Sequence, residues 1–171
     1  MVVMDERILA ARDAEKMFAR SGGFEAGEMG LLGVVAAHGV EFFYAPVRRH
    51  TMNAEFDLSL VTDLPAVDIR YSYAGASGND IGEKVKGVVV ATTGFTPAER
   101  TFYENLHQKG IVVASTFPSG ENVGSPSSPK DKDSNVVAVE RLTPLHARIL
   151  LMVALTKTND PVEIQRIFRE Y

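Results

Sequence analysis

The strongest constraint on the fold is the alternation of apolar, β-prone runs with helix signals in the second part of the chain. Residues 87–92 (GVVVAT) and 111–115 (IVVAS) are nearly continuous apolar runs, which is typical of strands buried on both faces of a parallel sheet. Further strands are expected at 67–73 and 136–139. Strands that alternate with helices join through crossovers into a parallel sheet. We therefore expect an α/β fold, a small Rossmann-like three-layer domain over residues 66–171.

Three helices carry recognisable start signals. Thr96-Pro97-Ala98-Glu99 offers an N-cap hydroxyl, a proline at the first helical position and a capping-box glutamate, and Gly110 is a suitable stop. Thr143-Pro144 opens a second helix that runs to about Lys157. Asp160-Pro161-Val162-Glu163 predicts a second capping box and a helix to the end of the sequence. One apolar face of that helix would contain Ile164, Ile167, Phe168 and Tyr171. A one-turn helix is expected at 81–86.

The first 65 residues have a different character. Residues 1–8 predict a strand, and residues 33–45 predict a hairpin that turns near His38-Gly39. Residues 53–64 form a polar connector. This part has too few apolar residues for a second full domain, so we expect an incomplete strand and hairpin lobe. Later in the chain, residues 117–135 are rich in proline, glycine and serine and predict a long loop.

Composition and missing motifs exclude several classes of function. There is no cysteine, which rules out disulfides and thiolate chemistry. The net charge of −4 comes from 18 basic and 22 acidic residues, and the only basic cluster is Arg48-Arg49-His50, so nucleic acid is not an expected partner. Dinucleotide, P-loop and nucleophile-elbow motifs are absent. The four histidines, which show no metal-ligand spacing, are His38, His50, His107 and His146. We expect no cofactor and no metal.

No membrane segment is expected. The longest apolar run, residues 149–155, is far too short to span a bilayer. The first residues, MVVMDER, lack the apolar core of a signal peptide. The sequence as written therefore predicts a cytoplasmic protein, or a periplasmic one if the native N-terminus precedes Met1.

The candidate ligand loop consists of Thr92, Thr93, Gly94, Phe95 and Thr96. Ligands of parallel sheets bind beyond the carboxyl ends of the strands, and this loop joins such an end to a helix N-terminus that could hold a carboxylate. The corresponding segments after the neighbouring strands are 72–77 and 115–120. Spacing alone favours a simpler interpretation, in which these residues turn the chain and cap the helix.

The C-terminal 30 residues carry a family resemblance. They read LTPLHARILLMVALTKTNDPVEIQRIFREY and closely resemble the end of type II bacterial L-asparaginases, LNPxKARxLLxLALTxTxDxxxIQxxFxxY. Residues 64–76 look like the first strand of that family's C-terminal domain, and 46–57 resemble its inter-domain linker. Residues 2–13 resemble a strand and turn near the end of its N-terminal domain. The resemblance implies an N-terminal-domain remnant at 1–45, a linker at 46–65 and a C-terminal domain at 66–171. Because family members form tetramers, it also implies a homo-oligomer.

The resemblance also implies which residues would act. Family members hydrolyse the side-chain amide of asparagine with threonines in T-G-G-T-I and T-D-T motifs and a lysine, and neither motif occurs in these 171 residues. No catalytic residue is therefore carried over. A neighbour-facing asparagine of the family, in a G-x-G-N loop, corresponds to Phe95. A family glutamate falls near Ser127 or Ser128, where the nearby acids are Glu121, Asp131 and Asp133.

Three hypotheses remain open at this point. The chain is an asparaginase-like C-terminal domain with a structural or small-ligand-binding role and no amidohydrolase activity of its own. Alternatively, it is a subunit of an L-asparaginase whose catalytic threonines come from a separate N-terminal half. The third hypothesis is a truncated product. An exposed sheet edge in the incomplete lobe predicts self-association into a homo-oligomer.

Overall fold

The protein is described from a computed structural model, which places residues 1–78, 80–120 and 135–171. Two compact units, Met1–Asn53 and Ala54–Tyr171, make up the chain and are treated separately below. The predicted loop at 117–135 falls mostly outside the described residues. The assignment of 1–45, 46–65 and 66–171 to remnant, linker and domain stays a prediction.

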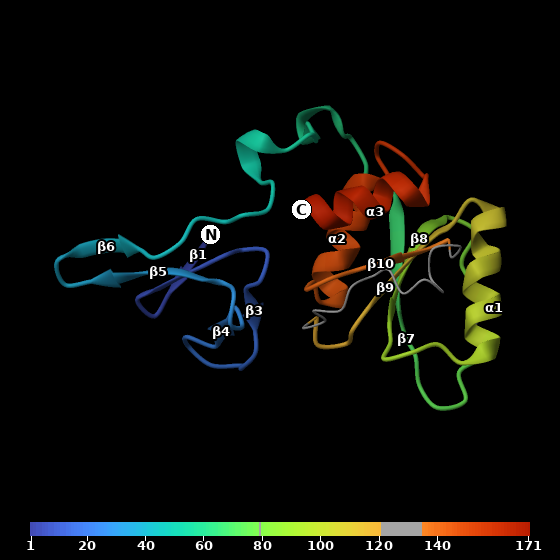
Figure 1. Cartoon of the computed structure of the whole chain (residues 1–171), viewed down its shortest axis with the longest axis horizontal. Helices are drawn as coiled ribbons and strands as arrows, with labels where there is room; N and C mark the ends of the chain where they lie inside the picture. The colour runs from blue at the N-terminus through green and yellow to red at the C-terminus, as the bar shows by residue number, and fades with distance from the viewer. Residues whose placement is uncertain (79, 121–134) are drawn as a thin grey trace. The chain divides into compact units, whose positions relative to one another are not determined.

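The second unit contains the predicted parallel sheet (Figure 1). Its strands, in spatial as well as chain order, are β7 (Ala66–Tyr71), β8 (Val85–Ala91), β9 (Val112–Thr116) and β10 (Val136–Ala138). All three neighbouring pairs are parallel. The helices are α1 (Pro97–Leu106), α2 (Pro144–Ala154) and α3 (Pro161–Glu170). Figure 1 shows α1 on one side of the sheet and α2 with α3 on the other, which confirms the three-layer α/β expectation.

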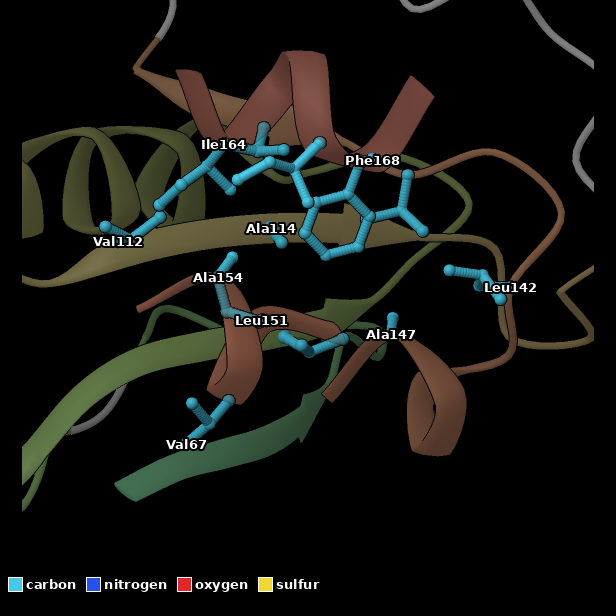
Figure 2. Close-up of a cluster of buried hydrophobic side chains, with 13 residues drawn as sticks. Val67, Val112, Ala114, Leu142, Ala147, Leu151, Ala154, Ile164 and Phe168 are labelled. Atoms are coloured by element: carbon cyan, nitrogen blue, oxygen red, sulfur yellow. The ribbon is translucent and has the colours of Figure 1, made fainter. Parts of the chain in front are cut away.

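The central strand β8 explains the three layers. Val88 and Val90 pack with Tyr103 and Leu106 of α1, whereas Val89, one residue out of phase, belongs to the opposite core cluster. That alternation is what a strand buried on both faces requires. The larger cluster joins β7, β9 and β10 to the two other helices, as Figure 2 shows for Val67, Val112, Ala114, Leu142, Ala147, Leu151, Ala154, Ile164 and Phe168.

A glycine lets α2 approach the sheet. A Cβ at Gly87 would lie 2.9 Å from the methyl carbons of both Leu151 and Leu155. Any larger side chain there would push α2 away from β8, since carbon atoms pack at about 3.5–4.0 Å.

The helix starts agree with their sequence signals only in part. Thr96 and Glu99 form the predicted capping box, and Gly110 ends the segment with φ +72° after the short 3-10 helix His107–Lys109. Asp160 caps α3 by accepting from the Val162 amide, but Glu163 bonds to Arg166 instead of completing the second box. The buried face of α3 is the predicted one, with Ile164, Ile167 and Phe168 all buried.

The one-turn helix expected at 81–86 is wrong. Residues 81–84 are irregular, and β8 already begins at Val85, which pairs with Ala66 of β7. Ile81 and Val85 pack into the α1-side core, and that burial together with strand pairing favours extended backbone. Residues 72–78 and 80–84, the described part of the connection from β7 to β8, therefore lack the helix that the alternating pattern suggested.

Residues 46–65, the predicted linker, contain two short 3-10 helices, Thr51–Asn53 and Leu58–Leu60, the latter capped by Asp57. Between them, Glu55 and Phe56 are fixed against the end of α3. The Glu55 amide donates to the Tyr171 hydroxyl at 2.6 Å, and the rings of Phe56 and Tyr171 lie 5.3 Å apart.

The first unit is a small antiparallel structure. One sheet has the order β1 (Val2–Met4), β2 (Arg7–Leu9), β5 (Leu31–Ala36) and β6 (Gly39–Phe42), and β3 (Glu15–Lys16) pairs with β4 (Phe24–Glu25). The hairpin predicted near His38-Gly39 is confirmed. The single strand expected at 1–8 is instead a hairpin, because Asp5 (φ 49°) and Glu6 (φ 59°) take the left-handed conformation of a tight turn.

Candidate functional site

The carboxyl ends of β7, β8 and β9 meet at one edge of the sheet. The amide of Ser72 donates to Ala91 and that of Thr92 donates to Thr116, so the three strands finish level with one another. This is the position at which a parallel sheet offers its chain ends to ligands. The predicted segments 72–77 and 92–96 are brought together here through side-chain hydrogen bonds.

Glu99 is the residue that joins these two loops. Its Oε2 accepts from the Ser72 hydroxyl at 2.9 Å and from the Thr96 amide at 3.0 Å. The Thr96 hydroxyl accepts from the Glu99 amide at 3.2 Å and donates to the Ala76 carbonyl at 2.9 Å. Glu99 is only 1% exposed. A carboxylate buried at a helix N-terminus is stabilised by the amides and the helix dipole, so the chain fills its own anion position.

The rest of the predicted ligand loop turns the chain and packs inward. The Thr92 hydroxyl accepts from the Gly94 amide at 2.9 Å, which closes a tight turn. The Phe95 ring lies 5.4 Å from the Tyr103 ring, and the Arg100 guanidinium lies 5.8 Å from the centre of Phe95. Phe95 therefore extends the core beneath α1. Ligand binding by Thr92–Thr96 stays a prediction.

Beside this loop, burial raises the pKa of the Tyr103 phenol, and the nearby Glu99 charge raises it further. Both effects disfavour a phenolate beside the buried Glu99 side chain. Tyr103 therefore remains a neutral aromatic residue around neutral pH and does not act as a base.

The third predicted segment, 115–120, faces a different part of the structure. The buried Thr116 hydroxyl donates to the Leu142 carbonyl at 2.6 Å. Gly120 has φ +72°, and a Cβ there would lie 2.6 Å from the Thr143 amide nitrogen. The side chain at the end of β9 is thus fixed against the segment before α2, and the hydrogen bond from the Thr92 amide to the Thr116 carbonyl links this end to the loop after β8.

Other candidate residues do not form a centre of reactivity. The histidines lie on the surface or on a helix face, with His38, His50 and His107 exposed and His146 half-buried beside Thr143. Arg49 of the basic cluster donates to the Asn53 carbonyl at 3.0 Å. Within the parts of the chain that are described, no group of three His, Cys, Asp or Glu side chains could hold a metal ion. The positions near Ser127 and Ser128, with Glu121, Asp131 and Asp133, lie outside the described residues.

Sequence reasoning missed two side-chain constellations. The first is the Ser72–Glu99 pair, of which only the capping role of Glu99 was visible. The second is an ion cluster in which Arg166 binds Glu55 at 2.8 Å and Glu163 at 2.6 Å, while Lys157 binds Glu55 at 2.9 Å. The i, i+3 spacing of Glu163 and Arg166 on a helix indicates their ion pair, but no local pattern in the sequence predicts that Arg166 also binds Glu55.

Comparison with known proteins agrees with the family resemblance. Residues 66–168 match the model of the glutaminase/asparaginase C-terminal domain. A glutaminase-asparaginase of Pseudomonas aeruginosa is 37% identical over 186 residues, which cover 100% of this chain and 50% of the relative. The crystal structure of a probable cytoplasmic L-asparaginase from Campylobacter jejuni has a TM-score of 0.88 and 33% identity, covering 100% of this chain and 55% of that one.

The chain spans about half the length of the relatives it matches. The names of the relatives give different locations. The Campylobacter jejuni protein is called cytoplasmic, whereas a Haemophilus influenzae protein is called a probable periplasmic L-asparaginase. The latter is 28% identical to this chain, over 100% of this chain and 52% of its own length. No helix among the described residues is long and apolar enough to cross a bilayer.

Proposed function

Because the chain belongs to the glutaminase/asparaginase family and corresponds to the C-terminal half of its type II L-asparaginases, we propose that it works as a structural C-terminal domain of that family. In this proposal the chain by itself does not hydrolyse asparagine or glutamine. Its role is to supply a stable α/β framework to a larger assembly.

The observation that supports this proposal is the internal carboxylate at the start of α1. A substrate carboxylate would need amides and hydroxyls at the strand ends, but Glu99 already accepts from the Ser72 hydroxyl and the Thr96 amide. The Thr96 and Thr116 hydroxyls donate to backbone carbonyls. A nucleophilic hydroxyl needs a general base within hydrogen-bond reach. Among the hydroxyls of Ser72, Thr96 and Thr116, only that of Ser72 donates to a carboxylate, and that carboxylate also accepts from the Thr96 amide.

The test is an ammonia-release assay on the purified chain with L-asparagine and with L-glutamine. The Pseudomonas aeruginosa relative serves as the positive control. We expect no release above the buffer background from this chain. Ammonia release that Ser72→Ala abolishes would contradict the proposal, because it would make the Ser72–Glu99 pair a catalyst. Ammonia release that persists in Ser72→Ala would also contradict the proposal, because another group would then catalyse the hydrolysis.

A second function is favoured by the length of the relatives. A protein named glutaminase-asparaginase contains a region similar to the whole of this chain together with about as much chain again. We infer as the alternative that this chain is one component of a two-part amidohydrolase, in which a separate N-terminal half provides the catalytic threonines. Amidohydrolase activity that arises only when such a half is added would favour this alternative over a purely structural role.

A further inference from the structure

The two edge strands of the parallel sheet, β7 and β10, are closed to different degrees. On β10, the Gln165 side chain bonds to both the amide and the carbonyl of Ala138. On β7, the Arg148 guanidinium donates to the Val67 carbonyl at 2.7 Å, near the start of the strand. An edge strand with open backbone groups is a template for pairing with another chain. The remainder of the β7 edge therefore decides whether this sheet is closed.

Hydrogen bonds at the two ends of β7 show which of its backbone groups point outward. The Ser72 amide, directly after the strand, donates inward to Ala91 of β8. The direction of the backbone groups alternates from residue to residue along a paired strand. Ser72 thus places the even-numbered residues inward, and residues 67, 69 and 71 present their amides and carbonyls outward. The Arg148 bond to the Val67 carbonyl agrees with this assignment.

Ile69 and Tyr71 are the outward residues whose backbone groups stay open. Within the described part of the chain, no hydrogen bond reaches their outward amides and carbonyls. Both residues are held extended by the pairing of β7 with β8. The Ile69 side chain packs against the larger core cluster, whereas Tyr71 is 61% exposed. The strand therefore offers an unpaired backbone that is already in the conformation a new strand needs.

Asp68 and Arg70 give this edge a self-complementary charge pattern. Alternate residues of a strand share a face, so both lie on the face opposite to Ile69. Their charged groups are 3.1 Å apart, and their side chains are 40% and 33% exposed. If two β7 strands pair antiparallel about a twofold axis through Ile69, Asp68 of each copy lies opposite Arg70 of the other. Opposite charges at directly opposed positions stabilise a strand pair, and like charges destabilise it.

The same axis also satisfies the backbone. The Ile69 amide of each copy donates to the Ile69 carbonyl of the other. The Tyr71 amide reaches the Val67 carbonyl, which can accept a second bond beside that of Arg148. An axis through Val67 or Tyr71 would still bring outward groups together, but it would lose the opposition of Asp68 and Arg70. Hydrogen bonding and charge therefore select one register.

We propose that the outward edge of β7, centred on Ile69, is a self-association surface whose partner is β7 of a second copy of this chain, paired antiparallel. The two four-stranded sheets then continue into each other across the twofold axis. Tyr71 of each copy lies diagonally across from Ile69 of the other and covers it. Strand addition obtains its affinity from main-chain hydrogen bonds. This inference does not depend on whether the chain acts in amide hydrolysis.

The first test follows association of the full chain by sedimentation velocity up to about 1 mM, so that dissociation constants in the micromolar range are resolved. Asp68→Arg and Arg70→Asp each place like charges opposite one another twice in the dimer. We expect each variant to weaken dimerisation at least about tenfold. The double variant exchanges the two charges and restores their opposition, so it should dimerise within about threefold of the unchanged chain.

Glu104→Arg is the matched control for Asp68→Arg. Glu104 is an acid of similar exposure (41% for its side chain) that pairs with Arg100 on α1, and its reversal changes the net charge by the same amount. It should leave the dissociation constant within about twofold of that of the unchanged chain. Recovery of the dimer in the double variant separates a charge effect from misfolding of the single variants.

Hydrogen exchange reads the edge without any substitution. In dilute solution the Ile69 and Tyr71 amides should exchange freely, and they should slow at least about tenfold at concentrations where the chain is dimeric. The inward amides of Arg70 and Ser72 are paired with β8 and should be slow at both concentrations.

Three results would overturn the proposal. These are a monomer at every concentration, a dimer that both charge reversals leave unchanged, and exchange at Ile69 and Tyr71 that does not depend on concentration. A dimer that only Phe42→Lys dissociates would place the contact in the first unit instead. Slow exchange of both amides in the monomer would mean that another part of the chain covers the edge. None of these outcomes bears on hydrolysis, which the ammonia-release assay tests separately.

Discussion

At the scale of single residues, Glu99 has more structural consequences than its capping role suggested. One carboxylate oxygen holds the loop after β7 through Ser72 and the loop after β8 through Thr96. Because Glu99 is buried, its removal leaves the Ser72 hydroxyl and the Thr96 amide without their protein acceptor. The side-chain connection between the loop after β7 and the loop after β8 therefore depends on Glu99.

Glu99→Ala should lower the free energy of unfolding by about 1–3 kcal/mol, since it leaves the Ser72 hydroxyl and the Thr96 amide without their acceptor. Urea unfolding at neutral pH measures the change. Glu104→Ala on the exposed side of α1 is the matched control and should change stability by less than about 0.5 kcal/mol. If Glu99→Ala unfolds at the same urea concentration as the unchanged chain, the junction does not stabilise the fold.

Tyr103 gives a prediction about alkaline pH. Its folded-state pKa is raised by burial and by Glu99, so at high pH the unfolded chain ionises before the folded chain does. The contribution of Tyr103 to stability is present below about pH 10 and is lost as the pH rises towards the folded pKa. Tyr103→Phe should therefore lose less stability between pH 9 and pH 11 than the unchanged chain, as measured by thermal unfolding across that range. An equal loss in both would show that Tyr103 ionises alike in the folded and unfolded states; Tyr44→Phe, at an exposed position, is the control.

At the scale of elements, α3 closes the outer edge of the parallel sheet. The Gln165 side chain accepts from the Ala138 amide and donates to the Ala138 carbonyl, both at 2.8 Å. A single side-chain amide thus satisfies both the amide and the carbonyl of Ala138, as a neighbouring strand would. This arrangement protects an edge that would otherwise be open to pairing with other chains.

Gln165→Leu should destabilise the protein by about 1–3 kcal/mol, because the half-buried amide and carbonyl of Ala138 lose their partners. Gln165→Glu keeps the acceptor and loses the donor. Its free energy of unfolding, measured by chemical denaturation, should therefore lie between those of Gln165→Leu and the unchanged chain. Val162→Ala, at an exposed position on the same helix, should have little effect. Faster hydrogen exchange at Ala138 in Gln165→Leu is the accompanying reading, and unchanged exchange there would contradict the proposed edge closure.

The elements themselves were largely predictable, whereas their side-chain links were not. The valine run of β8 and the Thr-Pro starts of α1 and α2 are local signals, and local signals suffice to place strands and helices. The helix expected at 81–86 fails because packing of Ile81 and Val85 overrides a weak local preference. The Ser72–Glu99 and Gln165–Ala138 links join residues 27 positions apart, which no local pattern encodes.

At the scale of the whole molecule, an ion cluster fixes the point where the chain enters the second unit. Hydrogen bonds from Lys157 and Arg166 lower the pKa of Glu55. The Glu55 side chain is mostly buried, while its two basic partners are a third to a half exposed. The cluster therefore joins the segment before β7 to α3, 111 residues later.

Because the folded pKa of Glu55 is lowered, its contribution to stability is present above about pH 4.3 and is lost as the pH falls through the folded pKa. Glu55→Gln should cost about 1 kcal/mol at pH 7, after allowance for solvent screening of its partners, and almost nothing near pH 2. Thermal unfolding measured from pH 2 to pH 7 tests this. A constant difference between the two proteins over that range would show that charge is not the cause.

The order of the parallel strands has a consequence for synthesis. Each strand from β7 to β10 lies beside the strand made just before it, so the sheet can grow from one side as the polypeptide leaves the ribosome. The amide and carbonyl of Ala138 lack their side-chain partner until Gln165 has been synthesised and bonds to both. The hydrogen bonding of Ala138 is therefore completed only by α3, which follows all four strands of the sheet in the chain.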